Sequence, residues 1–325
     1  MKVAVLDDYQ RAFEGTEAIQ RLRQKLDVQI FTDKLPTEEA LIHALKGVKA
    51  IIPIRERTKF PAALLQALTD LEFISQTGNH AYHVDMDAAT KAGIVVAMAP
   101  GSNSTAELAF GLMLAVMRRI PQSDRAMRRG EWPLVLGYVL RGKTLGILGL
   151  GKIGTEVARI GRVFGMKIIA WGPTLTPERA SRSQAVYTPI DDLLKEADVV
   201  SVHLALSNRS KNLLNEARLR LMKKSAYLIN TAQGAIVDER ALVKVLQEQT
   251  IAGAALDVFV DEPLAANHPL LQLDNVVLTP HLGWPTDSGF AGFAENAVTN
   301  ILDYLDGKLT RVINPEALQN RPKRG

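Results

Sequence analysis

The chain has 325 residues, of which 47% are hydrophobic and 23% are charged, and its formal net charge is +4. This length allows two domains, and the composition is typical of a soluble globular protein. The absence of cysteine excludes disulfides, thiolate zinc sites and cysteine nucleophiles. Basic and acidic residues are interleaved, and no apolar run approaches the ~18 residues of a membrane span. We therefore expect a cytoplasmic protein without nucleic-acid or membrane partners.

The first hundred residues predict a parallel α/β sheet, because short β-branched runs alternate with amphipathic segments. Strands are expected at 3–6, 28–31, 50–53, 72–75 and 95–98, and helices at 37–45 and 61–68. A strongly apolar helix is expected at 106–120, and a less regular arm that contains Trp132 follows it.

A second βα series begins at Thr144 and has the rhythm of a doubly wound nucleotide-binding sheet. Its strands are expected at 145–148, 168–171, 199–203, 227–230, 252–256 and 276–278, and its helices at 153–164, 216–221 and 238–246. A last helix at 293–305 and an apolar return at 312–313 suggest that the chain comes back to the first domain. We predict two Rossmann-like α/β domains: residues 102–290 bind a dinucleotide, and residues 1–101 with 291–325 form a discontinuous substrate domain.

A glycine-rich segment follows the first strand of the second series and reads Gly149-Leu-Gly151-Lys152-Ile153-Gly154. Gly149 permits a tight turn, Gly151 lets a pyrophosphate approach the backbone, and Gly154 lets helix and strand pack closely. Free N–H groups at the start of the following helix would face the phosphates. The segment therefore predicts a dinucleotide site.

The second strand of this series ends without the acidic side chain that would bind the ribose hydroxyls of NAD. It continues as Gly172-Pro-Thr174, and Thr174, Arg179 and Arg182 offer donors to a 2′-phosphate. This pattern modestly favours NADP. If the two arginines are merely solvated, NAD binds through other contacts, so both cofactors stay open.

Two downstream segments have the residue types of an acid–base pair. Glu262 precedes Pro263, and His281 follows Thr279-Pro280 at the end of the last expected strand. Histidine can deliver a proton near neutral pH, and a neighbouring carboxylate favours its charged form and fixes its tautomer. Either segment alone would more often be an ordinary turn.

Together with the glycine loop, these segments resemble the D-isomer-specific 2-hydroxyacid dehydrogenases over nearly the whole chain, including Ala254-Ala-Leu-Asp257-Val-Phe. The resemblance implies hydride transfer between NAD(P)H and a 2-oxo acid or D-2-hydroxy acid. It also implies that His281 donates the proton and that Glu262 orients His281. The resemblance implies cofactor contacts at Gly149, Gly151, Lys152, Ile153, Thr231 and Asp257. The residues themselves add Gly154 of the glycine loop, Gly172 and Thr174 at the strand end, and His203 as a residue beside the cofactor.

The same resemblance gives several of these positions a role. Asp257 would hold the nicotinamide carboxamide. Arg55 and the backbone N–H groups of Gly78 and Asn79 would bind the substrate carboxylate. No metal is implied, and a homodimer through the helix at 106–120 is expected.

One residue departs from the family pattern. The family segment reads Asn-Thr-Ser/Ala-Arg-Gly, whereas this chain reads Asn230-Thr-Ala-Gln233-Gly. Glutamine supplies a neutral donor in place of a charged fork. Charge-assisted hydrogen bonds contribute ~1.5–3 kcal/mol against ~0.5–1.5 kcal/mol for neutral ones. The turnover of an ordinary 2-oxo acid is therefore expected to suffer.

Three explanations of Gln233 compete. Arg55 or Arg57 supplies the missing charge, the substrate presents no carboxylate at this point, or the chain is a dinucleotide-binding regulatory protein with weak or no turnover. A deliberate Arg-to-Gln substitution would give the same sequence. Retention of both Glu262 and His281 favours an enzyme, because a pure binding module needs no paired acid and base.

Overall fold

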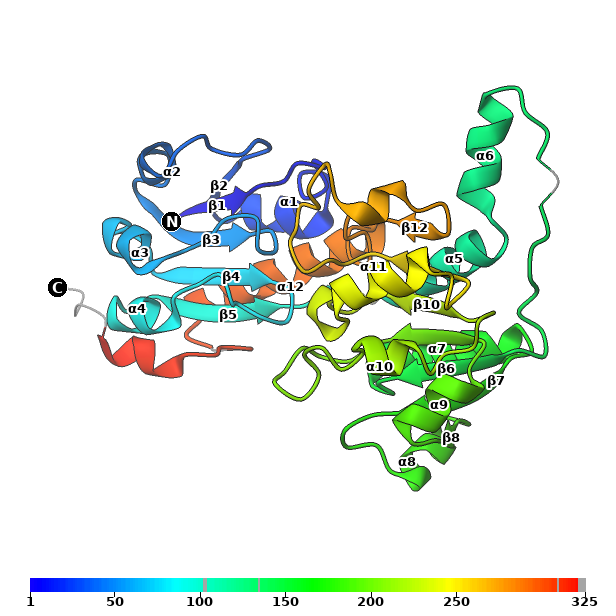
Figure 1. The fold of residues 1–325 in the computed structure, drawn as a ribbon. Coiled ribbons are helices and arrows are strands. Elements are labelled where there is room, and N and C mark those ends of the chain that lie inside the picture. The colour runs from blue at the N-terminus through cyan, green and yellow to red at the C-terminus, as the bar shows by residue number, and fades with distance from the viewer. Residues whose placement is uncertain (102–103, 134, 309, 321–325) are drawn as a thin grey trace. The chain divides into compact units, whose positions relative to one another are not determined.

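A computed structural model describes residues 1–101, 104–133, 135–308 and 310–320 (Figure 1). The chain forms two compact units, Met1–Ser102 with Pro285–Gly325, and Asn103–Trp284. Each unit is a parallel sheet covered by helices, which confirms the predicted fold class. None of the helices in the described ranges combines the length and apolar character needed to cross a membrane.

The first unit contains a five-stranded parallel sheet in the order β2-β1-β3-β4-β5. The strands are β1 (Lys2–Leu6), β2 (Asp27–Ile30), β3 (Val48–Pro53), β4 (Phe73–Thr77) and β5 (Val95–Ala99). The helices are α1 (Glu17–Arg23), α2 (Glu38–Ala44), α3 (Ala62–Ala67), α4 (Met86–Lys91) and α12 (Asp287–Leu305), and a 3₁₀ segment, η3, covers Pro315–Asn320. All five expected strands are present, whereas α1 and α4 were not predicted.

The expected return of the chain to the first unit is confirmed. Helix α12 packs on β4 and β5, and Val312 forms an antiparallel bridge with Ala97. The helix begins at Asp287 rather than at residue 293, because Thr286 caps it by accepting a hydrogen bond from Gly289 N. The domain boundary expected at residue 290 therefore falls inside a continuous helix.

The second unit contains a seven-stranded parallel sheet in the order β12-β11-β10-β9-β6-β7-β8. Its strands are β6 (Thr144–Leu148), β7 (Lys167–Trp171), β8 (Val186–Tyr187), β9 (Val199–Val202), β10 (Tyr227–Asn230), β11 (Gly253–Leu256) and β12 (Val276–Leu278). Strands β9, β10 and β11 are buried throughout, as parallel strands covered on both faces must be.

Helices cover both faces of this sheet. They are α5 (Thr105–Met117), α6 (Ile120–Arg128), α7 (Lys152–Val163), α8 (Pro177–Arg182), α9 (Ile190–Glu196), α10 (Glu216–Leu219) and α11 (Glu239–Gln247), with 3₁₀ segments η1 (Gly234–Ile236) and η2 (Pro269–Gln272). Helices α5 and α7 share one apolar core, and α9, α10 and α11 share another. The strand order equals the doubly wound order of dinucleotide-binding sheets, with its reversal between β6 and β9.

The single helix expected at 106–120 is wrong. Helix α5 ends at Met117, and Arg119 adopts a left-handed φ of 53° before α6 starts. Pro121 lies in the first turn of α6, where its missing N–H costs nothing. In a continuous helix the same proline would remove a hydrogen bond and clash with the preceding turn. The arm that follows α5 therefore starts with a helix of its own.

Candidate active site

The expected cofactor and catalytic residues of the second unit lie along one edge of its sheet. Each follows the carboxyl end of a strand: His281 follows β12, Asp257 β11, Thr231 and Gln233 β10, His203 β9, Gly149 β6 and Gly172 β7. Because these strands are parallel neighbours in that order, their carboxyl ends form a continuous row. Ligands of open α/β sheets bind at such an edge, where the strand order reverses.

The glycine loop has the geometry predicted for it. Gly149 has a φ of 102°, and a Cβ there would lie 2.6 Å from His203 O. A Cβ at Gly154 would lie 2.0 Å from Gly149 O, so both positions require glycine. A Cβ at Gly151 would meet nothing within 4 Å, which leaves open space at the start of α7.

This space fits a dinucleotide. No side chain caps the N-terminus of α7, so the N–H groups of exposed Lys152 and half-buried Ile153 point toward the space beside Gly151. Two buried polar atoms of the same edge, Nδ1 of His203 and Oγ1 of Thr231, have no hydrogen-bond partner among the described residues. Buried polar atoms are normally paired, so these two suit the groups of a bound cofactor.

His203 is held neutral at this edge. Burial lowers its pKa to about 4, and its Nε2 lies 2.8 Å from Ser201 Oγ. As the pH falls, the unfolded chain binds this proton near the ordinary pKa of 6.5, well before the folded chain does. The stability that His203 contributes is therefore complete above pH 6.5 and is lost as the pH falls through 4.

We expect the free energy of unfolding to fall by about 2 kcal/mol between pH 7 and pH 5 through His203 alone. The measurement is urea unfolding of cofactor-free protein at both pH values. His203→Gln removes the titration and should flatten this part of the profile. His43→Gln changes an exposed histidine of α2 and should leave it intact. An unchanged slope in His203→Gln would contradict the assignment.

The end of β7 carries no acidic side chain. Gly172 and Thr174 follow the strand, and the guanidinium of Arg179 donates a hydrogen bond of 2.8 Å to Thr174 O. The side chains of Thr174, Arg179 and Arg182 are all exposed. The strand end therefore presents donors and positive charge to solvent, and no carboxylate repels a phosphate there.

The acid–base pair expected from the sequence is formed. His281 Nδ1 lies 2.8 Å from Glu262 Oε2, and each side chain is 36% exposed, so solvent-borne groups reach both. The other carboxylate oxygen, Oε1, accepts a hydrogen bond from Phe259 N at 3.0 Å. The carboxylate is thus fixed to its own loop while it holds one ring nitrogen of the histidine. The ring is therefore oriented through Nδ1.

Asp257 ties its own strand end to the turn that carries His281. Its side chain is fully buried, and its two oxygens accept hydrogen bonds from Thr279 Oγ1, Leu282 N and Gly283 N at 2.6, 2.7 and 2.9 Å. Burial raises the pKa of Asp257, and these three donors oppose that rise. The contact of Asp257 with the nicotinamide carboxamide stays a prediction.

His281 itself adopts a left-handed φ of 56°, a conformation that is unfavourable for a residue with a Cβ. The His281 N–H lies 3.0 Å from both Asp257 O and Thr279 O, which hold the backbone in this turn. Such backbone outliers cluster at functional sites.

Gln233 is brought to the same place by a close backbone contact. A Cβ at Gly234 would lie 2.1 Å from Phe259 C and 2.6 Å from Val260 N, so the two turns touch backbone to backbone. Asn230 Nδ2 donates to Gln233 O at 3.0 Å and fixes the turn. The Gln233 side chain is half-buried and makes no hydrogen bond to another described residue. The structure thus unites Gln233 with the loop that carries Glu262.

Glu239 supports the loop that carries Glu262, which the sequence did not predict. Glu239, at the start of α11, accepts a hydrogen bond from Val260 N at 3.2 Å and one of 3.1 Å from His268. Thr279 and Glu239 therefore support the acid–base pair from outside it. These roles follow only from tertiary contacts with Asp257 and with the loop that carries Glu262, because the local sequence around Thr279 and Glu239 gives no sign of them.

In the first unit, Arg55 and Gly78 fit each other closely. Arg55 has a left-handed φ of 57°, and a Cβ at Gly78 would lie 2.2 Å from Arg55 Nη1. The Gly78 N–H donates to Ala99 O at 2.7 Å, so it does not serve a substrate carboxylate as expected. Asn79 is exposed, and its N–H bonds to no other described residue.

The charge of Arg55 is compensated within its own unit. Its Nη2 lies 3.2 Å from Glu56 Oε1, and the same oxygen lies 2.9 Å from His80 Nε2. Although burial acts in the opposite direction, the hydrogen bond from His80 and the charge of Arg55 hold the pKa of Glu56 at about 2. The His80 ring stacks on that of Tyr82 at 4.5 Å.

No group of histidines and carboxylates suited to a metal ion occurs in the part of the chain that the structure describes.

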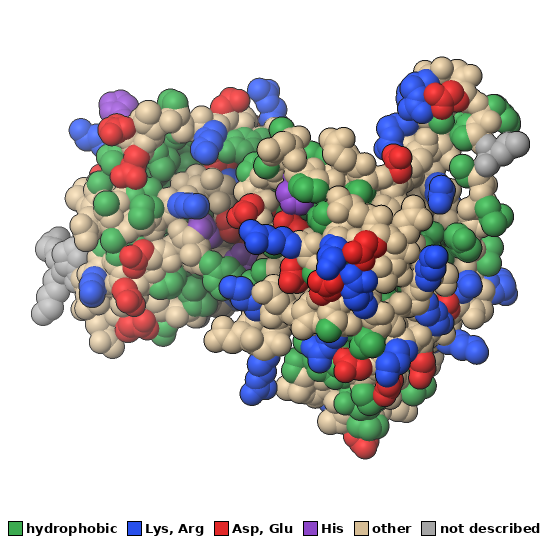
Figure 2. Space-filling model, viewed as in Figure 1, with side chains coloured by type: hydrophobic (Ala, Val, Ile, Leu, Met, Phe, Trp, Pro, Cys, Tyr) green, Lys and Arg blue, Asp and Glu red, His purple; other side chains and the backbone are tan. Residues whose placement is uncertain are grey.

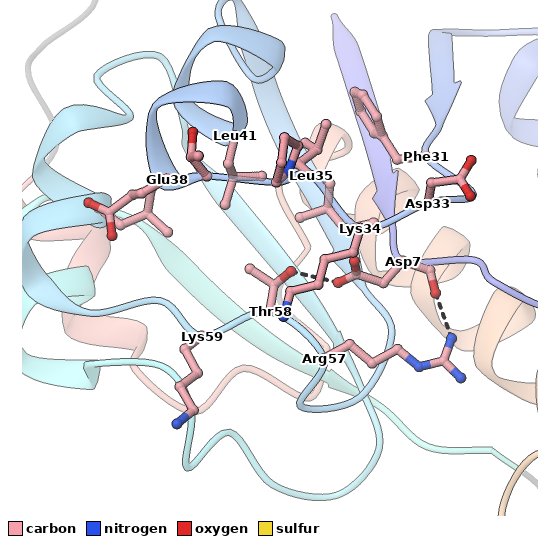
Figure 3. A pocket seen from close by; sticks show the side chains of 14 residues that line it. Asp7, Phe31, Asp33, Lys34, Leu35, Glu38, Leu41, Arg57, Thr58 and Lys59 are labelled. Carbon is pink, nitrogen blue, oxygen red and sulfur yellow. Dashed lines mark hydrogen bonds between the residues drawn. The ribbon is translucent and has the colours of Figure 1, made fainter. Parts of the chain in front are cut away.

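A separate cavity of about 310 Å³ opens at the carboxyl ends of β1, β2 and β3 in the first unit (Figure 3). Asp7 Oδ2 accepts a hydrogen bond of 2.6 Å from Thr58, and Asp7 O accepts one of 2.5 Å from Arg57. The charged lining comprises Lys34, Arg57, Lys59, Asp7, Asp33 and Glu38. These three cations and three anions balance, so the lining does not select an anion.

Comparison with known proteins decides the family. Residues 110–283 match the model of the "D-isomer specific 2-hydroxyacid dehydrogenase, NAD binding domain". The chain is 39% identical to a glyoxylate reductase of Thermococcus litoralis over 94% of this chain and 95% of that protein. The chain belongs to the D-isomer-specific 2-hydroxyacid dehydrogenase family. Members of this family are NAD(P)-dependent oxidoreductases that interconvert 2-oxo and 2-hydroxy acids by hydride transfer, and this chain is one of them.

Solved structures of similar proteins agree with this assignment to the 2-hydroxyacid dehydrogenases. A putative D-3-phosphoglycerate dehydrogenase from Ralstonia solanacearum is 37% identical, with a TM-score of 0.90 over 99% of this chain and 98% of that one. A structure described as an acyclic imino acid reductase in complex with NADPH and D-Arg is 29% identical, with a TM-score of 0.79 over 96% of this chain and 100% of that one.

Proposed function

We propose that this dehydrogenase reduces the C2 atom of a small 2-oxo acid or a closely related compound, with the His281–Glu262 pair as its acid–base machinery. The observation that carries the proposal is the contact of 2.8 Å between His281 Nδ1 and Glu262 Oε2, at the same sheet edge as the glycine loop. A protein that only binds a dinucleotide has no use for this pair.

In the proposed reaction, a bound reduced nicotinamide supplies the hydride. Glu262 accepts the Nδ1 proton of His281, and the Nε2–H of the ring points away from the carboxylate. His281 delivers that proton to the substrate oxygen as C2 is reduced. Asp257 and Thr279 keep the histidine in its left-handed turn. Arg55 and Asn79 of the first unit remain our candidates for the substrate carboxylate.

The test is oxidation of NADPH and NADH by purified protein with glyoxylate, hydroxypyruvate and pyruvate. We expect turnover with at least one of them. Absence of turnover with all three acids and with the imines that they form with amines, by a protein that binds the cofactor, would contradict the proposal. The names of similar proteins cover both C=O and C=N reduction, so the panel also extends to imines.

We further propose that NADPH is preferred over NADH. The exposed end of β7 offers Thr174, Arg179 and Arg182 to a 2′-phosphate, and no acidic side chain stands at that strand end. Loss of one charge-assisted hydrogen bond costs about 1.5–3 kcal/mol, which weakens binding at least tenfold. Arg179→Ala should therefore weaken NADPH binding about tenfold and leave NADH binding unchanged. Equal losses for both cofactors would contradict the preference.

We also propose that the protein forms a homodimer and that the arm between α5 and β6 packs against the second copy of the chain. The arm exposes large apolar side chains: Trp132 is 78% exposed, Leu136 79% and Val139 65%. Figure 2 shows hydrophobic side chains along this segment. Large apolar side chains exposed on one segment indicate an interaction site. The partner that would bury these side chains is a second copy of the chain, since a homodimer is expected for the family.

Leu136→Asp should convert the dimer into a monomer, because it places a charge on the surface that association would bury. The measurement is sedimentation equilibrium of the wild type and the variant. Val163→Asp is the matched control, since Val163 on α7 is 77% exposed and lies outside the arm. A monomeric wild type, or a Leu136→Asp protein that stays dimeric, would contradict the proposal.

A further inference from the structure

The side chain of Gln233 is the unusual element of this active site. Its backbone is pinned by Asn230 and by the contact of Gly234 with Phe259, so the side chain has a fixed origin. Its amide is half-buried and makes no hydrogen bond to another residue that the structure describes. A half-buried amide held beside an acid–base loop is suited to a ligand, and its chemistry indicates which one.

The charge that develops during reduction differs between two kinds of double bond. A carbonyl gains negative charge on its oxygen, and a nearby cation stabilises that charge. A protonated imine carries a positive charge at the start and loses it as C2 is reduced. A cation at residue 233 would therefore repel a protonated imine, whereas a neutral amide does not.

The hydrogen-bonding capacity of residue 233 points the same way. An arginine offers donors only, whereas a glutamine offers a carbonyl acceptor as well. The N–H of a protonated imine needs an acceptor, and Oε1 of Gln233 supplies one. Glu262 adds a negative carboxylate on the loop that touches the turn of Gln233.

We propose that this enzyme reduces imines formed between 2-oxo acids and amines in preference to the 2-oxo acids themselves. The inference rests on the proposed function and narrows its substrate. Gln233 Oε1 accepts the hydrogen bond of the imine N–H, and the neutral amide accommodates its charge.

The reaction balances with reactants of known class. A 2-oxo acid and a primary amine condense with loss of water, and His281 donates the proton that the imine nitrogen carries. C2 of the imine accepts the hydride of the reduced nicotinamide, and the π electron pair of the C=N bond becomes the lone pair of the nitrogen. The products are a secondary amine and the oxidised nicotinamide, and water returns a proton to His281.

The two arginines that were candidates to restore the missing charge are engaged in their own unit. Arg55 faces Glu56 at 3.2 Å. Arg57 donates to Asp7 O and lies over the Tyr9 ring, 4.6 Å from its centroid. Arg57 is thus held by its own partners, and Arg55 is assigned to the carboxylate that the imine retains. Neither arginine replaces a charge at residue 233, which favours a substrate that needs none there.

The test is NADPH oxidation with pyruvate alone, with methylamine alone and with both at mildly alkaline pH. N-methylalanine is identified by mass spectrometry. We expect the rate with both to exceed the rate with pyruvate alone at least tenfold. Gln233→Arg should reverse this order, and Gln233→Leu should lose the amine-dependent rate because it lacks the acceptor. Gln247→Arg makes the same chemical change on the exposed end of α11 and should alter neither rate.

A second readout does not depend on turnover. In calorimetry, the wild type loaded with oxidised cofactor should bind N-methylalanine more tightly than lactate, and Gln233→Arg should reverse the preference. Equal oxidation rates with and without methylamine would overturn the inference and leave the proposed function standing. No oxidation under any condition would overturn both.

Discussion

Replacement of His281 by asparagine is expected to lower turnover by about 10²–10⁴ for 2-oxo acids, the usual contribution of a positioned proton donor. Asparagine tolerates the left-handed φ of 56° that this position requires, so the backbone turn should survive. Glu262→Gln keeps the shape of the partner and removes its charge. Loss of a charge-assisted bond of about 1.5–3 kcal/mol corresponds to about ten- to hundredfold in rate.

The measurement for this pair is single-turnover oxidation of NADPH, with the dissociation constant of NADPH determined in parallel. Both variants should bind the cofactor as the wild type does, because neither side chain belongs to the glycine loop. His43→Gln, an exposed histidine of α2, is the control for a simple loss of histidine. Turnover of His281→Asn within threefold of the wild type would remove His281 from the mechanism.

Replacement of Gly234 by alanine is expected to damage stability and turnover together. The new Cβ would lie 2.1 Å from Phe259 C and 2.2 Å from Phe259 O, both backbone atoms of a loop tied down by Asp257 and Glu262. Overpacking of this kind costs about 1–3 kcal/mol. A displacement of about 1 Å between Gln233 and the acid–base pair would reduce turnover about a hundredfold.

The test combines urea unfolding with turnover at a temperature where the variant is folded. Gly15→Ala is the matched control, because a Cβ there meets nothing within 4 Å. It should be neutral in both measurements. A Gly234→Ala protein with wild-type stability and turnover would show that the turns of Gly234 and Phe259 can separate without loss of stability. It would contradict the role proposed for their contact.

Much of the fold follows from the sequence, because its strands carry a strong local signal. The buried strands β10 and β12 lie at the predicted residues 227–230 and 276–278. The elements that were missed are short: α4 has six residues and β8 has two. Segments of this length form through a cap or a single neighbouring strand, so they leave little periodicity in the sequence.

The candidate site shows a similar division. Glycines and the Glu262–His281 pair are recognisable because their chemistry restricts the residue type. The hydrogen bonds of the Asp257 side chain could not be predicted, because its three donors, Thr279, Leu282 and Gly283, lie more than twenty residues away in the chain. The occupied N–H of Gly78 depends on the register of β4 beside β5. Such tertiary hydrogen bonds have no local signature.

The most direct measurement is the fate of a deuterium label. NADPH deuterated at the transferable C4 position is incubated with the protein and pyruvate, with and without methylamine, and the products are analysed by mass spectrometry. Hydride transfer to C2 predicts a product that carries one deuterium at C2 and a cofactor that has lost it. A product without deuterium, or no product under either condition, would contradict the account.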